Sequence, residues 1–373
     1  MTLEAVTAAL DDAGLDRSEV DGLAGYAGQV MGPRPGGFNG MHGTSLAALH
    51  DALRLDLRWW SGSNEGPGQY VGLFNAIAAV AAGLARHVVV FRTQTEASVR
   101  QAKRNLVPPP EEYGPPSIDD WLLPMRVASS FNWVALFAQR YFDQYGMTRE
   151  QLAQIALTAR HNASLNPAAV YRTPLTIDDY FDAPMMSTPL CLLDCDIPVD
   201  GSTAIVISHR DTAKDSRHPV TFIDAIGTGL GGRTAIDQFD DMTKMGVYAP
   251  ARTMWSRTDL CPSDVDIAYL YDGYSFIVVP WLEALGFCAH GEAGAFLEGG
   301  TRISLHGELP LNTDGGHLSA GRTHGFGYLV EACQQFRGTC GDRQVADPEV
   351  AVIATGGGTS SQGCLLVTSA PNE

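Results

Sequence analysis

The residues best suited to chemistry follow a short apolar run in the second half of the chain. Ile267 to Leu270 predicts a buried strand, and Tyr271, Asp272 and Tyr274 come directly after it. Ligands of α/β proteins bind beyond the carboxyl ends of their strands. There, Asp272 is a candidate general base, or the group that orients a tyrosine. Because side chains alternate along an extended segment, we expect only one tyrosine to face the site; the alternative is that both are packing aromatics with tethered hydroxyls.

A glycine-rich stretch, Gly315 to Tyr328, supplies the second set of candidates. His324 stands at the expected start of a helix, which disfavours imidazolium and favours a neutral donor or base. His317 is a second imidazole, and Tyr328 is a candidate to supply or relay a proton. Each of the three also suits a purely structural role. Asp314, His317 and His324 fit no known spacing of metal ligands, so no metal site is expected.

Alternating helical and extended patterns must position these residues. Helices are predicted at Thr2 to Ala13 (ending at Gly14), Tyr70 to Leu84, Met147 to Ser164, Phe276 to Leu285 and Tyr328 to Phe336. Strands are predicted at Asp21 to Gly25, Arg86 to Arg92, Ser202 to Ser208, Asp266 to Tyr271, Val350 to Thr355 and Gly363 to Thr368. Trp59 to Gly68 predicts a Gly/Ser-rich turn, and Pro108 to Pro116 a proline-rich surface loop. This order predicts an α/β protein that is doubly wound in each half.

The polar segment Arg210 to His218 indicates where two domains meet. We predict an N-terminal domain over residues 1–210, with a loop insertion at about 92–145, and a C-terminal domain over 211–373. The chain starts with a helix, which is unusual for an α/β fold. We therefore expect that a preceding strand is missing from this numbering.

Composition and charge exclude several classes of protein. The 373 residues are 45% hydrophobic, which indicates a globular protein. A formal net charge of −17 argues against binding to nucleic acid, whose phosphates need a basic surface. No uninterrupted apolar run reaches the length of about 18 residues that spans a membrane. The first residues lack the basic start and apolar core of a signal peptide, so we expect a cytoplasmic protein.

Cysteines and lysines limit the possible mechanisms. The seven cysteines include no CxxC pair, which predicts free thiols in a reducing compartment rather than disulfides or a zinc site. Lysine occurs only at Lys103, Lys214 and Lys244, and none of these lies in an apolar strand or Gly-rich setting that would lower its pKa. We therefore expect neither a Schiff base nor a bound cofactor.

Five segments, in chain order, resemble the thiolase superfamily and its sterol-carrier-protein thiolase branch. They are His161 to Pro167, the strand after Asp200-Gly201, Tyr271 to Tyr274 (where the branch carries His-Asp-Cys-Phe), Asn312 to Gly316, and Ala354 to Gly358. The resemblance extends over nearly the whole chain. The resemblance implies the thiolase fold, with two related βαβαβαββ-type halves in five α-β-α-β-α layers.

The chain departs from this family at four catalytic positions. The nucleophilic cysteine falls at about Gly66, the two catalytic histidines at Tyr271 and near Arg322, and the second cysteine at Thr355. Without a thiolate, acyl transfer through an enzyme-bound thioester is not expected. The same loss, together with Tyr-Asp-Gly-Tyr-Ser-Phe at residues 271–276, resembles the lipid-transfer-protein-like aldolases that cleave steroid side chains in actinobacterial sterol degradation.

This closer resemblance implies a reaction and an assembly. The reaction is retro-aldol cleavage of a 17-hydroxy steroid C-20 carboxyl-CoA thioester to a 17-keto steroid and propionyl-CoA. The implied partner is the zinc-ribbon and OB-fold domain of a hot-dog-fold enoyl-CoA hydratase subunit, around a homodimer of the thiolase type. One alternative is an acyltransferase with a relocated nucleophile at Cys261, Cys288 or Cys364. The other is a non-catalytic lipid carrier or scaffold subunit.

The resemblance also implies a thioester-binding region. Backbone N–H groups of Gly66 and Gly68, at the start of a helix, are candidates for an oxyanion hole. Glu65 is either a second carboxylate of the site or part of a solvent-facing loop. The remaining candidates for substrate and CoA contacts are Gly315, Gly316, Arg322, Gly356, Gly357 and Gly358.

Overall fold

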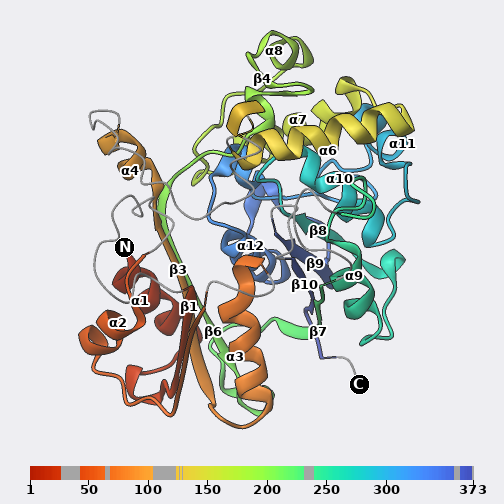
Figure 1. Ribbon diagram of the computed structural model, residues 1–373. Coiled ribbons are helices and arrows are strands. Elements are labelled where there is room, and N and C mark those ends of the chain that lie inside the picture. The colour runs from red at the N-terminus through yellow and green to blue at the C-terminus, as the bar shows by residue number, and fades with distance from the viewer. Residues whose placement is uncertain are drawn as a thin grey trace.

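The computed structural model describes residues 1–26, 43–63, 68–103, 123–125, 127, 129–230, 239–356 and 362–371. Within these ranges the chain forms two four-stranded sheets, a two-stranded hairpin and the helices around them (Figure 1). No helix of this described part is both long and apolar enough to cross a membrane.

The first sheet has the strand order β2-β1-β3-β6. Its strands are β1 (Gly22–Tyr26), β2 (Trp59–Ser63), β3 (His87–Thr95) and β6 (Asp200–Ser208). β1 pairs in parallel with β2 and β3, and β6 runs antiparallel to β3. Helices α1 (Thr2–Ala13) and α2 (Leu46–Leu53) contact one face, and α3 (Val71–Ala81) contacts the other. Gly72 allows this close packing, because a Cβ there would lie only 3.2 Å from the backbone of Gly25.

The second sheet has the order β7-β10-β9-β8. Its strands are β7 (Phe222–Thr228), β8 (Ile267–Leu270), β9 (Val350–Thr355) and β10 (Gly363–Thr368). β8 and β9 are parallel, whereas β10 is antiparallel to both β9 and β7. Helices α9 (Tyr248–Trp255) and α10 (Ser275–Ala284) cover the outer face, and α12 (Phe326–Phe336) covers the inner face.

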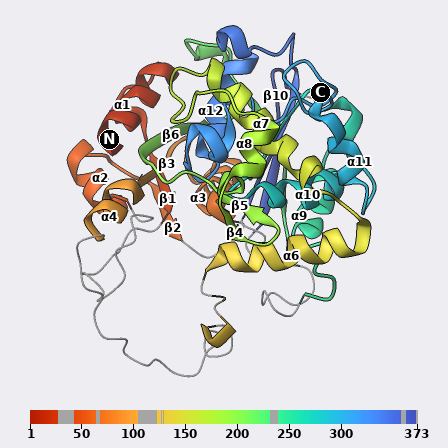
Figure 2. The ribbon, with the colours of Figure 1, turned by 90° about the horizontal axis from the view of Figure 1, so that it is seen from above.

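The two sheets and their helices form the five layers that the thiolase resemblance implied. Figures 1 and 2 show α3 and α12 between the sheets, with α1 and α2 on one outside and α9 and α10 on the other. Three apolar cores fill the spaces between the layers. Along β3, Val88 and Val90 enter the central core while Val89 and Phe91 enter the outer one. This alternation directs Arg92, two residues after Val90, toward the centre of the molecule.

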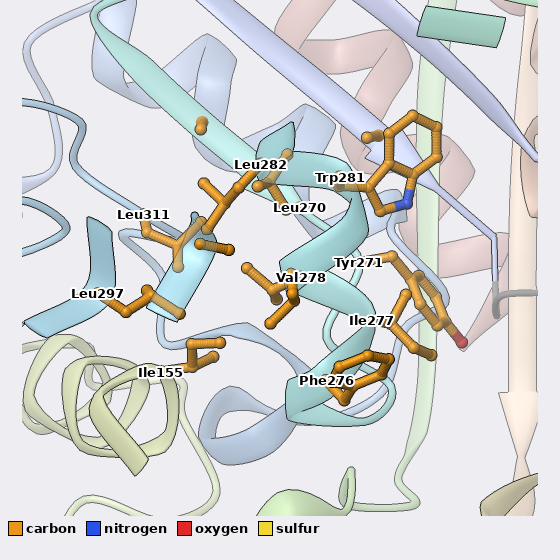
Figure 3. Close-up of a cluster of buried hydrophobic side chains, with 14 of the residues drawn as sticks. Ile155, Leu270, Tyr271, Phe276, Ile277, Val278, Trp281, Leu282, Leu297 and Leu311 are labelled. Atoms are coloured by element: carbon orange, nitrogen blue, oxygen red, sulfur yellow. The ribbon is translucent and has the colours of Figure 1, made fainter. Parts of the chain in front are cut away.

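Most of the remaining elements come between β3 and β6 in chain order. They are α4 (Glu96–Lys103), α6 (Ser130–Tyr145), α7 (Arg149–Leu165), α8 (Ile177–Asp182), β4 (Met185–Ser187), β5 (Leu190–Cys191) and α11 (Ala293–Leu297). α6 and α7 both pack against α10. On the outer side of the second sheet, Phe276, Val278 and Trp281 of α10 belong to one apolar cluster with Leu270 and Ile155 (Figure 3).

Most predicted elements are confirmed. α1 ends at Gly14, which adopts the left-handed conformation with φ 72°. α7 begins after Thr148, whose hydroxyl accepts from the backbone N–H of Gln151 in a capping box. The boundary near residue 210 stays a prediction, although β6 ends at Ser208 and β7 begins at Phe222.

Two predictions about loops are wrong. The turn predicted from Trp59 to Gly68 contains β2, because parallel pairing with β1 satisfies the backbone of Trp59 to Ser63 despite its glycine and serines. The insertion predicted as a loop at about 92–145 holds the end of β3 and the helices α4 and α6. The proline-rich segment at 108–116 lies outside the described residues.

Candidate active site

The carboxylate of Asp272 lies at the centre of the site, two residues after β8. It is fully buried, with 0% exposure. It accepts hydrogen bonds from the backbone N–H groups of His317 (2.8 Å) and Leu318 (3.4 Å), and from the hydroxyl of Tyr328. A buried carboxylate is stable only with such donors. Asp272 therefore fixes the segment from residue 317 to residue 328 against the end of β8.

His317 completes this network with a defined tautomer. Its Nε2 accepts from the backbone N–H of Gly325 at 2.9 Å, so the neutral ring carries its proton on Nδ1. That Nδ1 lies 3.2 Å from Oδ1 of Asp272 and 3.3 Å from the Tyr328 hydroxyl. Burial, and next the Asp272 carboxylate, raise the pKa of Tyr328 well above its usual value. Asp272, His317 and Tyr328 thus satisfy one another's hydrogen-bonding groups. Such an arrangement is suited to positioning the neighbouring side chains.

The glycines that precede His317 pack against protein atoms. Gly315 and Gly316 have φ values of 104° and 60°, which favour glycine. A Cβ on Gly316 would lie 2.1 Å from Oδ2 of Asp272, and one on Gly315 would lie 2.5 Å from Cβ of Ala163. Close approach to the Asp272 carboxylate and to α7 therefore explains both glycines without a CoA contact.

Tyr271 and Tyr274 point to different surroundings, as the alternation predicts. The ring of Tyr271 packs edge-to-face on His317, with centroids 4.8 Å apart, and burial raises its pKa well above the usual value. In Figure 3 its hydroxyl points away from the apolar cluster, and it has no hydrogen-bond partner in the described part of the chain. The half-buried Tyr274 shares a 2.9 Å hydrogen bond with Ser130, and burial raises its pKa to about 12. Tyr271 is therefore the phenol with unused hydrogen-bonding capacity.

His324 is held as a neutral donor. It has a positive φ of 53° and lies just before α12, whose N-cap is Gly325. Nη2 of Arg92 lies 2.6 Å from its Nδ1, and since arginine only donates, the ring proton must be on Nε2. Burial, followed by the charges of Arg92 and Arg322, lowers the pKa of His324 well below that of a free histidine.

Arg322 is already engaged by two carboxylates. Its Nη1 lies 2.9 and 3.1 Å from the oxygens of Asp196, and its Nη2 pairs with Glu96. Asp196 itself is fixed by its N–H, which donates to the carbonyl of Gly273. Its pKa is raised well above the usual value by burial and then by Asp272. Arg322, predicted to contact CoA, therefore links the two halves of the chain in this structure.

Arg92, Glu96 and Asp196 are site residues that the sequence did not indicate. Arg92 and Glu96 share the inward-facing positions of β3 and its continuation into α4. A charged residue near the end of so apolar a strand (Arg92), and another directly after it (Glu96), could have indicated a functional site in the sequence. Charged side chains are rarely buried unless they are paired or functional. Asp196 lies in a segment that crosses between Gly273 and His317, to whose carbonyls the N–H groups of Asp196 and Ile197 donate.

The predicted thioester-binding glycines are only partly described. Glu65, Gly66, Gly357 and Gly358 lie outside the described residues. Gly68 (φ 63°) is buried just before α3, and Gly356 (φ 120°) follows β9. The Thr355 hydroxyl donates a 2.6 Å hydrogen bond to Oε1 of Gln69. The residue before Gly356 is therefore in contact with the residue after Gly68.

The three cysteines considered as relocated nucleophiles lie elsewhere. Cys261 is exposed in a turn, with its thiol 3.0 Å from Oδ2 of Asp264. Burial raises the pKa of Cys288 to about 12, and it also raises the pKa of Cys364 within β10. A nucleophilic cysteine needs the opposite shift. In the ranges that the structure describes, no group of three or more His, Cys, Asp or Glu side chains is arranged to hold a metal ion.

Comparison with known proteins shows which fold class this chain belongs to. Residues 232–370 match the family described as "Thiolase C-terminal domain-like". A solved structure of a monomeric SCP2-thiolase-like protein type 1 from Mycobacterium smegmatis covers 100% of this chain and 75% of its own, with a TM-score of 0.69 at 14% identity. That likeness concerns the fold alone, and it agrees with the five layers described above.

The family follows from nearer relatives. The chain is 32% identical to the steroid side-chain-cleaving aldolase of Thermomonospora curvata, over 98% of this chain and 92% of the relative. It is 31% identical to the 17-hydroxy-3-oxo-4-pregnene-20-carboxyl-CoA lyase of Mycobacterium tuberculosis, over 98% and 93%. The solved Ltp2-ChsH2(DUF35) aldolase matches with a TM-score of 0.85 at 31% identity, over 99% and 92%. The chain belongs to the family of the steroid side-chain-cleaving aldolases, and it is a carbon–carbon lyase.

Substitution of Gly316 tests its close approach to Asp272. We expect Gly316→Ala to lower the melting temperature by at least about 4 °C more than Gly338→Ala does. Both glycines have a similar positive φ, 60° and 67°, but a Cβ at Gly338 meets nothing within 4 Å. The control therefore carries backbone strain alone, whereas Gly316→Ala also displaces the Asp272 carboxylate. Equal losses in thermal unfolding of the two variants would contradict this role of Gly316.

Proposed function

We propose that this chain cleaves the side chain of a 17-hydroxy steroid C-20 carboxyl-CoA thioester by a retro-aldol reaction, releasing a 17-keto steroid and propionyl-CoA. The family membership supports the reaction class, and the named substrate of the Mycobacterium tuberculosis relative supports the substrate. The site contributes the chemical argument, which rests above all on the hydroxyl of Tyr271, for which the described ranges contain no hydrogen-bond partner.

The reaction moves one proton and one electron pair. The bond between C17 and C20 breaks, and its electrons move onto the thioester carbonyl oxygen to form an enolate. The C17 hydroxyl loses its proton and becomes a ketone, and C20 of the enolate gains a proton. Since nothing is oxidised or reduced, the enzyme needs only a proton carrier and donors for the enolate oxygen. Neither a metal nor an imine is part of this proposal.

Tyr271 suits the role of proton carrier. Its phenol can accept the proton of the C17 hydroxyl while its own proton passes to C20. The hydroxyl oxygen and C20 are both bonded to C17, so one phenol can reach both. The tyrosine then stays neutral throughout, which is what a buried phenol with a raised pKa favours. The ring is held in place by His317, with which it packs at 4.8 Å.

His324 suits the role of donor to the thioester carbonyl oxygen. Its Nε2 carries the ring proton, because Nδ1 is occupied by Arg92. A neutral donor aimed at the carbonyl stabilises the enolate more than the ground state, which lowers the barrier. Asp272, His317 and Tyr328 act behind these two residues by fixing the backbone from residue 317 to Gly325.

A tyrosine-to-phenylalanine comparison tests this assignment. We expect Tyr271→Phe to lower kcat for propionyl-CoA release by about 10²–10⁴-fold, because the proton carrier is lost. Tyr145→Phe is the matched control: it removes a hydroxyl that bonds to Nε2 of His290, away from the site. Both enzymes are assayed with the partner subunit and a steroid CoA thioester. If Tyr271→Phe keeps the wild-type rate, Tyr271 is not the proton carrier; if the wild type releases no propionyl-CoA, the chain is instead a carrier or scaffold.

The assembly extends this proposal. The similarity to the Ltp2-ChsH2(DUF35) aldolase supports a DUF35-type partner subunit, and a CoA-thioester substrate supports a cytoplasmic location. A homodimer is supported by β2, which is the edge strand of the first sheet and carries Trp60 with 68% of its surface exposed. Unpaired edge strands of this kind readily pair with a second chain.

Sedimentation of the isolated chain tests the homodimer. We expect a mass of about twice 39.9 kDa for the wild type and a shift toward the monomer for Trp60→Lys, which places a charge in the apolar contact. Leu84→Lys, at another exposed apolar residue on the turn after α3, should leave the mass unchanged. A wild-type mass of one chain at micromolar concentration would contradict pairing through β2.

A further inference from the structure

Arg92 is a buried cation without a counterion. Its side chain is 4% exposed, and in the part of the chain that the structure describes it forms no salt bridge. Nη2 is used by His324, but Nε and Nη1 have no hydrogen-bond partner among the residues that the structure describes. The guanidinium lies over the ring of Tyr26, 3.9 Å from its centroid. Arg322 nearby is different, because two carboxylates bind it.

This arrangement costs free energy in the absence of a ligand. Buried charges are ordinarily paired, and buried N–H groups ordinarily have acceptors. Burial lowers the pKa of Arg92 to about 10, which still leaves the group charged at neutral pH. Proteins keep such unpaired donors at functional sites, at a cost in stability, because a bound anion accepts their hydrogen bonds. The free N–H groups therefore indicate that a negatively charged atom arrives from outside the chain.

The position of Arg92 identifies which atom that is. Arg92 extends from β3 toward the centre of the molecule and contacts His324, the proposed donor to the thioester carbonyl. Its charge also acts on Tyr271, the proposed proton carrier. An anion bound by Arg92 would therefore also be near His324, with which Arg92 is in contact. In the proposed reaction, the negative charge that develops there is that of the enolate oxygen.

We propose that Arg92 is a catalytic residue that donates a hydrogen bond from Nη1 or Nε to the enolate oxygen of the departing thioester. This inference rests on the proposed function and adds a residue to it. As the C17–C20 bond breaks, its electron pair reaches the carbonyl oxygen, and the fixed positive charge balances the new negative one. No covalent bond to Arg92 forms, and its proton stays in place. His324 is the second donor, and its tautomer depends on Arg92.

Substitution by a neutral side chain of similar length tests the proposal. We expect Arg92→Met to lower kcat by about 10²–10³-fold, with less than a threefold change in KM, because the charge interacts with the transition state. We also expect its melting temperature to stay equal or rise, since an unpaired buried charge is removed. Arg92→Lys should recover part of kcat, because the charge returns without the forked donors.

Arg343→Met is the matched control for stability. Arg343 is also shielded from solvent but is paired with Glu331 at 2.9 and 3.0 Å, so its loss strands a carboxylate and should lower the melting temperature. Arg92→Met with wild-type kcat, or with only KM raised, overturns the role of Arg92 and leaves the proposed function intact. A fall in melting temperature that accompanies the loss of activity assigns Arg92 to structure and also overturns it. A wild-type enzyme that cleaves no steroid thioester overturns both.

Discussion

The buried carboxylate of Asp272 is the constraint on which the site depends. It lies beyond the end of β8, out of contact with water, and its charge is balanced by donors that all come from residues 317–328. Those contacts fix the backbone that carries His317 and delivers His324 to the space between the two halves. Gly316 has no side chain because the carboxylate occupies the place where a Cβ would stand. Packing and chemistry are thus coupled through one charged group.

Around this satisfied network, the site leaves a few polar groups unsatisfied. The hydroxyl of Tyr271, Nε2 of His324 and two nitrogens of Arg92 have no partner among the described residues, whereas Asp272 and Tyr328 bond to one another and both Nη atoms of Arg322 are paired with carboxylates. Unmade hydrogen bonds in a buried region cost stability, so their concentration here is typical of a site that is completed by its substrate. These groups support our proposal that a thiolase fold without its nucleophilic sulfur stabilises an enolate and cleaves a carbon–carbon bond.

The sequence was sufficient for the fold and for half of the site. Strand β8 and the segment from Tyr271 to Tyr274 follow from a short apolar run, and the start of α12 beside His324 follows from a glycine signal. Arg92 and Asp196 were missed because their role depends on tertiary packing, which brings β3 and a crossing segment of the first half against the second. Local patterns also failed for β2, where pairing with a neighbouring strand outweighs a poor strand composition.

In the proposed reaction the thioester bond of the substrate stays intact while a carbon–carbon bond breaks. Turnover of the enzyme and its partner subunit in the presence of isotopically labelled free CoA tests this directly. Retro-aldol cleavage releases propionyl-CoA that carries the substrate's own CoA, so mass spectrometry should find no label in the product. Labelled propionyl-CoA formed at the rate of side-chain loss would mean that an acyl group had passed to free CoA, which retro-aldol cleavage does not allow.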